Sequence, residues 1–424
     1  MPKQTLQKWG SSTLGDAINI IDGDRGKNYP KQDEFFDSEY CLFLNTKNVP
    51  ANSFSFDEKM FITQEKDSKL RKGKLTRGDF VLTTRGTVGN FAYYSDKIPF
   101  KNMRINSGMV ILRLDKDGKL SRDYFRFYLD SPLFRGQIKS HSTGSAQPQL
   151  PIRDLSVFKI EFPNLITQQQ ISDVLSVYDD LIENNARRIQ ILEQTAQAVY
   201  TEWFVNFRFP GHEKVKMVNS GTNFGEIPEG WEVKMIGDVC TRIQAGGTPR
   251  RGKDEFWDNG TINWYTTGEL QDNFLFGSKE KITEQSIDET SAKIFDKGTI
   301  LMAIYGSPTV GRLGITIERS SCNQAALGLV EDSKKITKTY LYYVLRNLRE
   351  KFNLEAVGAA QQNISKIKVS ETRCLVADRD LIDQFDVIAF PIFQEIESLQ
   401  RQNDVLRQTR DLLLPKLVTG EIQV

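Results

Sequence analysis

Apolar residues recur with a heptad period in one long central stretch of the chain, Gln168–Phe207. This stretch contains neither Gly nor Pro, so no residue in it interrupts a helix. Its apolar side chains follow a heptad spacing, with a second row one helical turn further on, and charged residues occupy most of the other positions. The second row comprises Leu175, Ile182, Ile189, Ala196 and Trp203. The pattern predicts a long amphipathic helix.

The same pattern returns in the same phase at the end of the chain, so that Phe385 corresponds to Ile171 and Leu413 to Val199. A helix of about 40 residues is about 60 Å long, which is more than packing on one small domain requires. We therefore predict that the two helices pair with each other as an antiparallel coiled coil. The predicted seam residues are Ile171, Tyr178, Leu192, Val199, Phe385, Ile392, Leu399, Leu406 and Leu413.

Two asparagines, Asn185 and Asn403, fall on these apolar stripes. A buried polar residue fixes the register of paired helices in many coiled coils, and this is one interpretation. The other interpretation is that both asparagines lie at an exposed edge of the seam. The pattern alone leaves the two open.

The segments between the helices also repeat. The step from Trp9 to Leu14-Gly15-Asp16 returns as the step from Trp231 to Ile236-Gly237-Asp238. Further matches follow in the same order, with a separation that shrinks slowly along the chain: Phe43–Thr46 with Trp264–Thr267, Gly78 and Gly86 with Gly298 and Gly306, and Gly144–Gln147 with Gly358–Gln361. An unchanged order with a drifting separation is typical of a duplicated unit whose loops have changed length.

The repeat predicts alternating globular and helical segments. Short β-type runs such as Asp79–Thr84, Gly108–Leu114 and Thr299–Tyr305 dominate each globular segment, and short helices such as Asp123–Asp130 and Lys338–Leu348 come late in it. This order favours an α+β fold. The predicted segments are a first globular unit (1–163), a central spacer helix (164–207), a linker rich in Gly, Pro and polar residues (208–229), a second globular unit (230–377) and a C-terminal spacer helix with a tail (378–424).

Composition narrows the class of protein. The chain has 424 residues, 39% hydrophobic and 26% charged, with a net charge of +1. This composition is typical of globular proteins with more than one domain. No apolar run is long enough to span a bilayer, and the N-terminal segment lacks the apolar core of a signal peptide, so a cytoplasmic protein is expected.

Catalytic and metal-binding signatures are missing from the sequence. The four cysteines are scattered without a CxxC spacing and are expected to be small buried side chains, and only two histidines are present. The sequence contains no phosphate-binding loop, no HExxH motif and no Gly-rich cofactor loop. We therefore expect no catalytic residue and no metal ligand in this chain, and an enzyme that acts alone is disfavoured.

Clusters of cations point to nucleic acid. Phosphate contacts are predicted at Lys69, Arg71, Lys72, Lys74, Arg77 and Arg104 in the first unit and at Arg250 and Arg251 in the second. Lys and Arg side chains bind phosphate oxygens of DNA. The alternative for each cluster is an ordinary solvated surface, and the presence of a cluster in both repeats favours DNA.

Base-reading side chains are predicted on the short loops of each unit. Arg pairs with guanine, and Asn or Gln pairs with adenine. The candidates are Arg85, Asn106, Gln147 and Gln149 in the first unit and Tyr305, Ser307, Asn323, Gln361 and Gln362 in the second. The repeated loops keep their glycines and differ in these side chains, as expected for one scaffold that reads two sequences. For the Gly-Ala-Gln loops, the alternative is a turn that seats the unit on its helix.

These residues resemble those of a known family. The segments WFVNFRFPGHE (Trp203–Glu213), GEIPEGWEVKMIGDV (Gly225–Val239), GGTPRR followed by FW (Gly246–Trp257) and LLLPKLVTGEIQV (Leu412–Val424) resemble the specificity subunits of Type I restriction-modification enzymes. The resemblance covers essentially the whole chain. The first unit departs from the pattern, because IDGDRGKNYP (Ile21–Pro30) stands where the second unit has its Gly-Gly-Thr-Pro turn.

The resemblance implies a function. Each globular unit is then a target recognition domain that reads one half of a bipartite double-stranded DNA sequence, and the helices are the spacer. Two modification subunits with S-adenosylmethionine chemistry and two motor-nuclease subunits that use ATP and Mg²⁺ are the implied partners, whereas this chain binds no cofactor itself. Two alternatives stay open from the residues alone: a coiled-coil scaffold without sequence readout, and a single-chain DNA-modifying enzyme.

Overall fold

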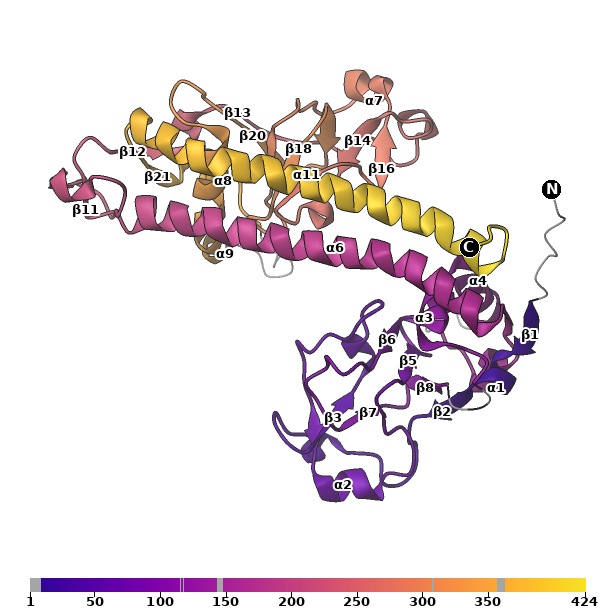
Figure 1. Ribbon diagram of the computed structural model, residues 1–424. Helices are drawn as coiled ribbons and strands as arrows, with labels where there is room; N and C mark the ends of the chain where they lie inside the picture. The colour runs from indigo at the N-terminus through magenta and orange to yellow at the C-terminus, as the bar shows by residue number, and fades with distance from the viewer. Residues whose placement is uncertain (1–8, 115, 117, 143–147, 307–308, 357–362) are drawn as a thin grey trace. The chain divides into compact units, whose positions relative to one another are not determined.

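The computed structural model describes residues 9–114, 116, 118–142, 148–306, 309–356 and 363–424 (Figure 1). Contacts divide the chain into two compact units. The first comprises Met1–Asp180 and Leu406–Val424, and the second comprises Leu181–Val405. Each long helix therefore contributes one end to each unit.

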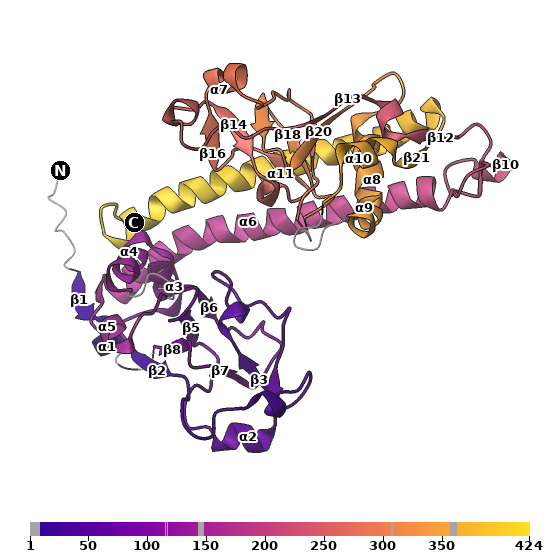
Figure 2. The same ribbon diagram turned by 180° about the vertical axis from the view of Figure 1, so that it is seen from behind.

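Two long helices, α6 (Leu165–Tyr200) and α11 (Arg379–Val418), lie side by side in both views (Figures 1 and 2). Each begins at a side-chain cap. Asn164 Oδ1 accepts a hydrogen bond from the Thr167 N–H at 3.0 Å, and Asp378 Oδ1 accepts one from the Leu381 N–H at 3.0 Å. The two caps match in the repeat, as Ile171 matches Phe385, so the helices begin at equivalent positions. A single π turn, Thr201–Val205, ends the first helix.

Contacts along the seam show that the helices are antiparallel. In the second unit, Arg188 forms an ion pair with Glu395 at 2.6 Å, and Asn185 contacts Asn403 at 3.1 Å. In the first unit, Asp179 pairs with Arg410 at 2.6 Å. The residue number falls along one helix as it rises along the other, which confirms the predicted antiparallel pair.

The predicted seam positions are all at least partly shielded from solvent. Those that are buried are Ile171, Phe385 and Leu399, and those that are half-buried are Tyr178, Leu192, Val199, Ile392, Leu406 and Leu413. The heptad positions therefore lie on sides of the two helices that are partly or fully shielded from solvent.

Small sheets, antiparallel except for the parallel pair of β3 with β7, form the first unit over the described residues. Among the described residues, one sheet has the strand order β2-β8-β5-β6, a second has the order β4-β3-β7, and β1 pairs with β9. The strands are β1 (Gly10–Thr13), β2 (Asn19–Asp22), β3 (Cys41–Leu44), β4 (Phe61–Ile62), β5 (Phe80–Thr83), β6 (Phe91–Tyr93), β7 (Met103–Ile105), β8 (Met109–Arg113) and β9 (Lys159–Phe162). The helices are α1 (Leu14–Ala17), α2 (Gln64–Lys69), α3 (Arg122–Asp130), α4 (Pro132–His141) and α5 (Ile152–Ser156).

The second unit repeats this topology with one added strand. Its described sheets have the orders β13-β20-β17-β18-β15 and β16-β14-β19, and β12 pairs with β21. The strands are β12 (Glu232–Met235), β13 (Cys240–Ala245), β14 (Ile262–Tyr265), β15 (Asn273–Leu275), β16 (Glu280–Ile282), β17 (Ile300–Ala303), β18 (Leu313–Thr316), β19 (Ser320–Cys322), β20 (Ala326–Glu331) and β21 (Arg373–Val376). The helices are α7 (Glu284–Glu289), α8 (Lys338–Asn347), α9 (Arg349–Glu355) and α10 (Lys366–Glu371).

The matching topologies confirm both the internal repeat and the α+β class. Strands β9 and β21, which lead into the long helices, are separated by the same interval as the helices themselves. In both units the parallel pairs join the equivalent strands, β3 with β7 and β14 with β19. The added strand β15 pairs parallel with β18.

One end of each long helix completes the core of a unit. In the second unit, Tyr200 and Phe204 are buried among Trp231, Tyr340 and Phe385. In the first unit the corresponding core receives the end of α11 through Leu414, Leu417 and Val418, which are buried with Tyr124 and Phe127. The helix ends are therefore part of the hydrophobic cores of the globular units.

The segment predicted as a linker, 208–229, contains ordered structure. Strands β10 (Met217–Asn219) and β11 (Glu226–Pro228) form an antiparallel hairpin, and Phe209 and Ile227 are buried in the second core. The Gly- and Pro-rich composition reflects the turns of this hairpin. Over the described residues, no helix combines the length and the apolarity that a membrane crossing requires.

Candidate nucleic-acid interface

Two loops that are distant in sequence meet at one edge of the first unit. Arg85, two residues after the end of β5, forms an antiparallel backbone bridge with Gln149, and the Leu150 N–H donates to the Thr84 carbonyl at 2.9 Å. Both Arg85 and Gln149 are exposed. In the part of the chain that is described, no acidic side chain pairs with Arg85, so its guanidinium is free to bind a ligand.

The second unit builds the same edge from the equivalent loops. Tyr305 forms an antiparallel bridge with Asn363, and the Ile364 N–H donates to the Ile304 carbonyl at 2.9 Å. The structure thus joins the predicted Tyr305 loop to the segment that begins at Asn363. Four of the predicted base-reading residues lie outside the described residues: Gln147, Ser307, Gln361 and Gln362. The same backbone therefore presents Arg85 and Gln149 in one unit and Tyr305 and Asn363 in the other.

A third loop at this edge is held by a side-chain amide. Asn106 Oδ1 accepts a hydrogen bond from the Gly108 N–H at 2.9 Å, and in the second unit Asn323 Oδ1 accepts one from the Ala325 N–H at 3.1 Å. Both asparagines are half-buried. These two predicted base-reading residues thus already use their acceptor oxygens to shape a turn, which leaves the amide NH₂ groups as their donors.

Glycines bring a fourth loop against the same turn. A Cβ atom at Gly23 would lie 2.2 Å from the Asn106 carbonyl oxygen, and one at Gly246 would lie 2.2 Å from the Cys322 carbonyl oxygen and 2.5 Å from that of Asn323. Only glycine permits so close a backbone approach. The loops that follow β2 and β13 are thereby fixed in equivalent positions.

The fourth loop of the first unit encloses a cationic hollow. A cavity of about 300 Å³ is lined by Asp22, Gly23, Asp24, Arg25, Gly26, Lys27, Asn28, Arg71 and Lys72. Asp24 fixes its floor, because its carboxylate accepts hydrogen bonds at 2.7 Å from the backbone N–H groups of both Gly26 and Arg71. Partial burial would raise the pKa of Asp24, but these backbone hydrogen bonds outweigh it and lower the pKa, so the carboxylate is ionised.

Two cations of this hollow, Arg25 and Lys27, are absent from the residues predicted as phosphate contacts. In the sequence, their segment stands out only as a departure from the second unit's Gly-Gly-Thr-Pro turn. Their position in the repeat identifies them. Both come shortly after Gly23, which is the first unit's equivalent of Gly246. The predicted residues Arg71 and Lys72 are exposed and line the same hollow.

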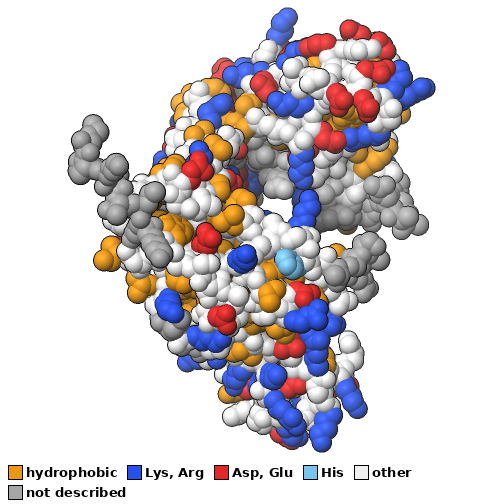
Figure 3. Space-filling model, turned by 90° about the vertical axis from the view of Figure 1, so that its right-hand side faces the viewer, with side chains coloured by type: hydrophobic (Ala, Val, Ile, Leu, Met, Phe, Trp, Pro, Cys, Tyr) orange, Lys and Arg blue, Asp and Glu red, His pale blue; other side chains and the backbone are white. Residues whose placement is uncertain are grey.

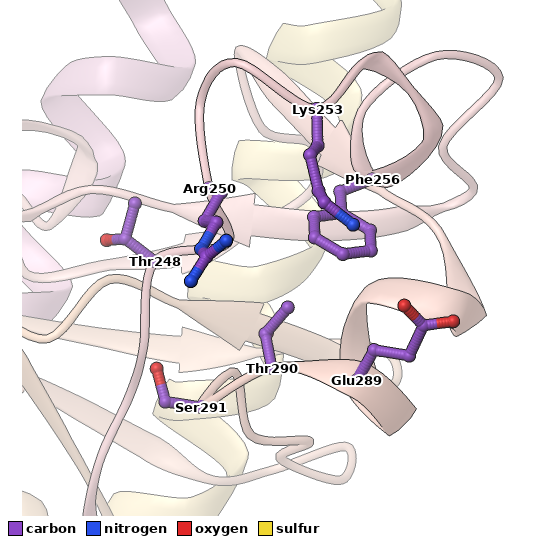
Figure 4. A pocket seen from close by; sticks show the side chains of 7 residues that line it. All are labelled: Thr248, Arg250, Lys253, Phe256, Glu289, Thr290 and Ser291. Atoms are coloured by element: carbon purple, nitrogen blue, oxygen red, sulfur yellow. The ribbon is translucent and has the colours of Figure 1, made fainter.

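The corresponding loop of the second unit forms a cavity of about 400 Å³ (Figure 4). Its lining residues are Thr248, Arg250, Lys253, Phe256, Glu289, Thr290 and Ser291. The cationic groups of Arg250 and Lys253 lie on one side, and Thr290 and Ser291 lie across from them (Figure 4). Arg250 is exposed and forms no ion pair within the described residues, which is the state required of a phosphate-binding side chain.

Arg251, predicted as a phosphate contact, has a different environment from its neighbour Arg250. Its guanidinium packs on the rings of Trp257 and Trp264, at 4.0 and 4.9 Å from their centroids, and pairs with the carboxylate of Glu280. This hydrogen bond lowers the pKa of Glu280. Arg251 therefore joins the strand β16 to the loop, and its cation is already neutralised.

Arg104 corrects the sequence-based prediction of a phosphate contact. It is only 4% exposed and donates from Nε to Asp67, from Nη1 to the Lys72 carbonyl at 2.6 Å and from Nη2 to the Leu70 carbonyl at 3.1 Å. The side chain holds the basic segment in place from beneath. Its charge is directed into the protein and is not available to DNA.

The remaining cations of the basic cluster also have structural partners. Arg77 donates to the carbonyls of Ile98 at 2.8 Å and Phe100 at 3.1 Å and packs on Tyr94. Lys74 pairs with Asp67 at 2.5 Å, and Lys69 pairs with Glu65 at 2.5 Å. Lys69 and Lys74 stay exposed, whereas the Arg77 head group is committed to a loop. Figure 3 shows Lys and Arg side chains gathered at the end of the first unit that carries α2, at the bottom of the view.

The four cysteines are free thiols, and none of them forms a disulfide with another. Cys41, Cys322 and Cys374 are buried, as the sequence predicted, whereas Cys240 is half-buried. Burial raises the pKa of the Cys322 thiol to about 12, so the thiol stays protonated. Across the described residues, no group of three or more His, Cys, Asp or Glu side chains is placed to hold a metal ion.

Comparison with known proteins identifies the relatives of this chain. The specificity subunit of the Type I restriction enzyme MjaIX from Methanocaldococcus jannaschii is 28% identical over 351 residues, which cover 82% of this chain and 78% of that protein. The specificity subunit of the Type I restriction enzyme HindI from Haemophilus influenzae is 22% identical over 94% of this chain and 98% of its own length.

A solved structure shares the fold. The S subunit of a Type I restriction-modification system from M. genitalium superimposes with a TM-score of 0.56 at 16% identity and covers 98% of both chains. The family model described as the Type I restriction modification DNA specificity domain matches residues 7–194 and 228–373, once for each half of the repeat. The chain is therefore a member of the family of Type I restriction-modification DNA specificity subunits.

Proposed function

We propose that each globular unit reads one half of a bipartite DNA target, and that the two long helices set the gap between the half-sites. The observation that carries the proposal is the repeated edge. Its backbone is the same in both units, through the Arg85–Gln149 and Tyr305–Asn363 bridges, while the side chains that it presents are different. One scaffold with two sets of side chains suits the reading of two different sequences.

The chemistry of the edge suits duplex DNA. An exposed Arg85 has the paired donors that recognise the O6 and N7 atoms of guanine in the major groove. Tyr305, half-buried at the equivalent position, offers a hydroxyl and a ring instead. The hollows beside these loops carry Arg71 and Arg250, which suit the phosphates that flank the bases.

The helix pair suits the role of a spacer. Its inner face is closed by apolar contacts and by the Asn185–Asn403 hydrogen bond, so its length is fixed by its sequence. A helix rises about 1.5 Å per residue, so the number of residues between the units sets a distance. Two readers on a rigid spacer accept only half-sites at one separation.

Exposed apolar residues at equivalent helix positions support the docking of two identical partners. Ile191 is 62% exposed, and its repeat equivalent Val405 is 57% exposed. Val174 and its equivalent Ile388 are 37% and 40% exposed. Repeat-equivalent apolar positions suit two copies of one protein, and we assign them to two modification subunits.

The catalytic work of the proposed complex lies on other subunits. Methyl transfer with S-adenosylmethionine would belong to the modification subunits, and ATP- and Mg²⁺-dependent translocation and cleavage to two motor-nuclease subunits. The target base, an adenine in this proposal, would be flipped from the duplex into the pocket of a modification subunit. This chain would then be non-catalytic, and it would act in the cytoplasm, where the DNA is.

The proposal is tested by assembling the chain with its modification subunits and methylating a plasmid library of random sequence. The expected result is one motif of two specified half-sites separated by a gap of constant length. Methylation without a shared bipartite motif would refute the proposal. Turnover by the isolated chain with S-adenosylmethionine would instead show that it is an enzyme in its own right.

A further inference from the structure

The repeat raises the question of which helix pairs with which. Helices α6 and α11 begin at equivalent positions, so a second copy of either half of the chain would offer a helix of similar length and the same period. In the register that aligns Ile171 with Phe385, a second α6 in the place of α11 would put its Ile189 where Asn403 lies. A second α11 in the place of α6 would put its Leu399 where Asn185 lies.

The first difference between the two pairings is the asparagine pair. Asn185 Nδ2 donates to Asn403 Oδ1 at 3.1 Å, and both residues are nearly buried. With two copies of α6, each Asn185 would face an Ile189, and with two copies of α11, each Asn403 would face a Leu399. Either like-with-like seam would bury two amides without the side-chain partner that each has on the facing helix of the native pair, which is unfavourable.

The second difference is a charge. Arg410 on α11 pairs with Asp179 at 2.6 Å, and its equivalent on α6 is Ala196, which is fully buried in the second core. A second α6 would leave Asp179 without its partner from the facing helix. A second α11 in the place of α6 would put Arg410 into the buried position of Ala196, where an unpaired cation is strongly unfavourable.

The third difference is the size of the buried side chains at the ends of the two helices. The end of α6 inserts Tyr200 and Phe204 into an aromatic core, with ring centroids of Phe204 and Tyr340 4.8 Å apart and those of Phe204 and Phe385 5.3 Å apart. The equivalent residues on α11 are Leu414 and Val418, which are buried in the first unit. Exchange would leave a void in the second core and overfill the first.

We propose that these three features make the seam select the pairing of the first half of the chain with the second half, against the pairing of either half with its own copy. The kind of partner that the seam excludes is therefore a second copy of the same half. This inference concerns assembly and does not rest on DNA recognition, so its test involves no DNA.

The test uses the full chain with a protease site inserted in the turn Ser220–Gly225 at the tip of the β10–β11 hairpin. The folded protein is cleaved there, and its isotopically light and heavy forms are mixed in the lowest urea concentration at which fragments exchange. Native mass spectrometry then counts the pairs. The expected result is that light and heavy fragments mix, but only first halves with second halves. Like-with-like pairs in the proportion of random assortment would overturn the proposal.

Two variants test the assigned residues. In a pair of two first halves, Asn185→Leu would place a leucine opposite Ile189. We expect it to increase the amount of that pair by about tenfold or more relative to the parent. The matched control is Asn184→Leu on the exposed adjacent position, which should cause no increase. Arg410→Ala should independently increase pairs of two second halves. Equal effects of Asn184→Leu and Asn185→Leu, or no effect of both Asn185→Leu and Arg410→Ala, would contradict the assignment.

Discussion

The side-chain amide of Asn185 donates a hydrogen bond across the helix seam to the side-chain oxygen of Asn403, with 3.1 Å between Nδ2 and Oδ1. Asn403 Nδ2 in turn donates to the Ile182 carbonyl at 3.4 Å. Both asparagines are nearly buried, at 6% and 3% exposure. The structure therefore decides between the two interpretations that the sequence left open: the asparagines form a buried pair across the seam, as a role in setting the register requires, and neither lies at an exposed edge.

Replacing one member of this pair should destabilise the protein. Asn185→Leu leaves the amide of Asn403 without its side-chain partner, and the expected loss is about 1–3 kcal/mol of unfolding free energy. The double variant Asn185→Leu/Asn403→Leu should recover most of it, because an apolar pair fits an apolar seam. Urea unfolding of the four proteins in the cycle measures the coupling. Additive losses would mean that the two side chains do not interact.

Arg85 is expected to read a base. Arg85→Ala should weaken binding to the cognate DNA by about 1–3 kcal/mol and relax one position of one half-site. Arg85→Lys should also relax that position, because a lysine lacks the paired donors of the guanidinium. Methylation of a plasmid library by the assembled complex gives the preference at each position. Uniform weakening across all sequences would identify Arg85 as a phosphate contact instead.

The adjacent residues Arg250 and Arg251 form a matched pair with opposite expectations. Arg250→Ala should weaken binding to all sequences alike and reduce the salt dependence of binding by about one unit of slope, with no change in stability. Arg251→Ala should lower the unfolding midpoint, because the side chain joins Glu280 to Trp257 and Trp264. DNA binding at several salt concentrations and thermal unfolding separate the two effects. Identical behaviour of the two variants would contradict the structural distinction.

Asp67 should stabilise the first unit in a pH-dependent way. Burial of Asp67 would raise its pKa, but hydrogen bonds from Lys74 and Arg104 outweigh this and hold the pKa below its usual value of 3.8. Because the folded-state pKa is lowered, the stabilisation is complete above 3.8 and is lost as the pH falls through the folded-state pKa.

The variant Asp67→Asn tests this relationship. It leaves Arg104 buried without its counter-charge, and the expected cost at neutral pH is about 3–5 kcal/mol. The difference in unfolding free energy between parent and variant should shrink as the solution is acidified below the usual pKa of an aspartate. Urea titrations at neutral and acidic pH measure it. A difference that stays constant with pH would exclude a role for the Asp67 charge.

Helix length should control the gap of the target. One heptad inserted within Ile171–Val199, with a matching heptad at the facing position of α11, lengthens the spacer by about 10 Å. At about 3.4 Å per base pair, the gap between half-sites should grow by about three base pairs while both half-sites stay the same. The methylated motif reports both quantities. A change within a half-site would show that the insertion disturbs a reading unit rather than the spacer.

Local patterns in the sequence determined the helices, the repeat and the fold class. The heptad stripe and the absence of Gly and Pro act over neighbouring residues, so they predict α6 and its inner face without knowledge of the rest of the chain. The glycines that match between repeats, such as Gly78 with Gly298, marked equivalent turns, and both have a positive φ angle. Because each pattern occurs twice in the same order, the order of the elements could be recognised from the sequence.

Only the tertiary structure decided which charged residues are open to a ligand. Arg104 and Arg71 look alike in sequence, but Arg104 lies under the basic segment against Asp67, whereas Arg71 lines an open hollow. Likewise Arg250 is open and Arg251 is stacked on tryptophans. A periodic helix is specified by its own residues, whereas the environment of a charge is set by strands and loops that are distant in sequence. For that reason the sequence determined the scaffold of this protein, and folding decided the surface with which it reads.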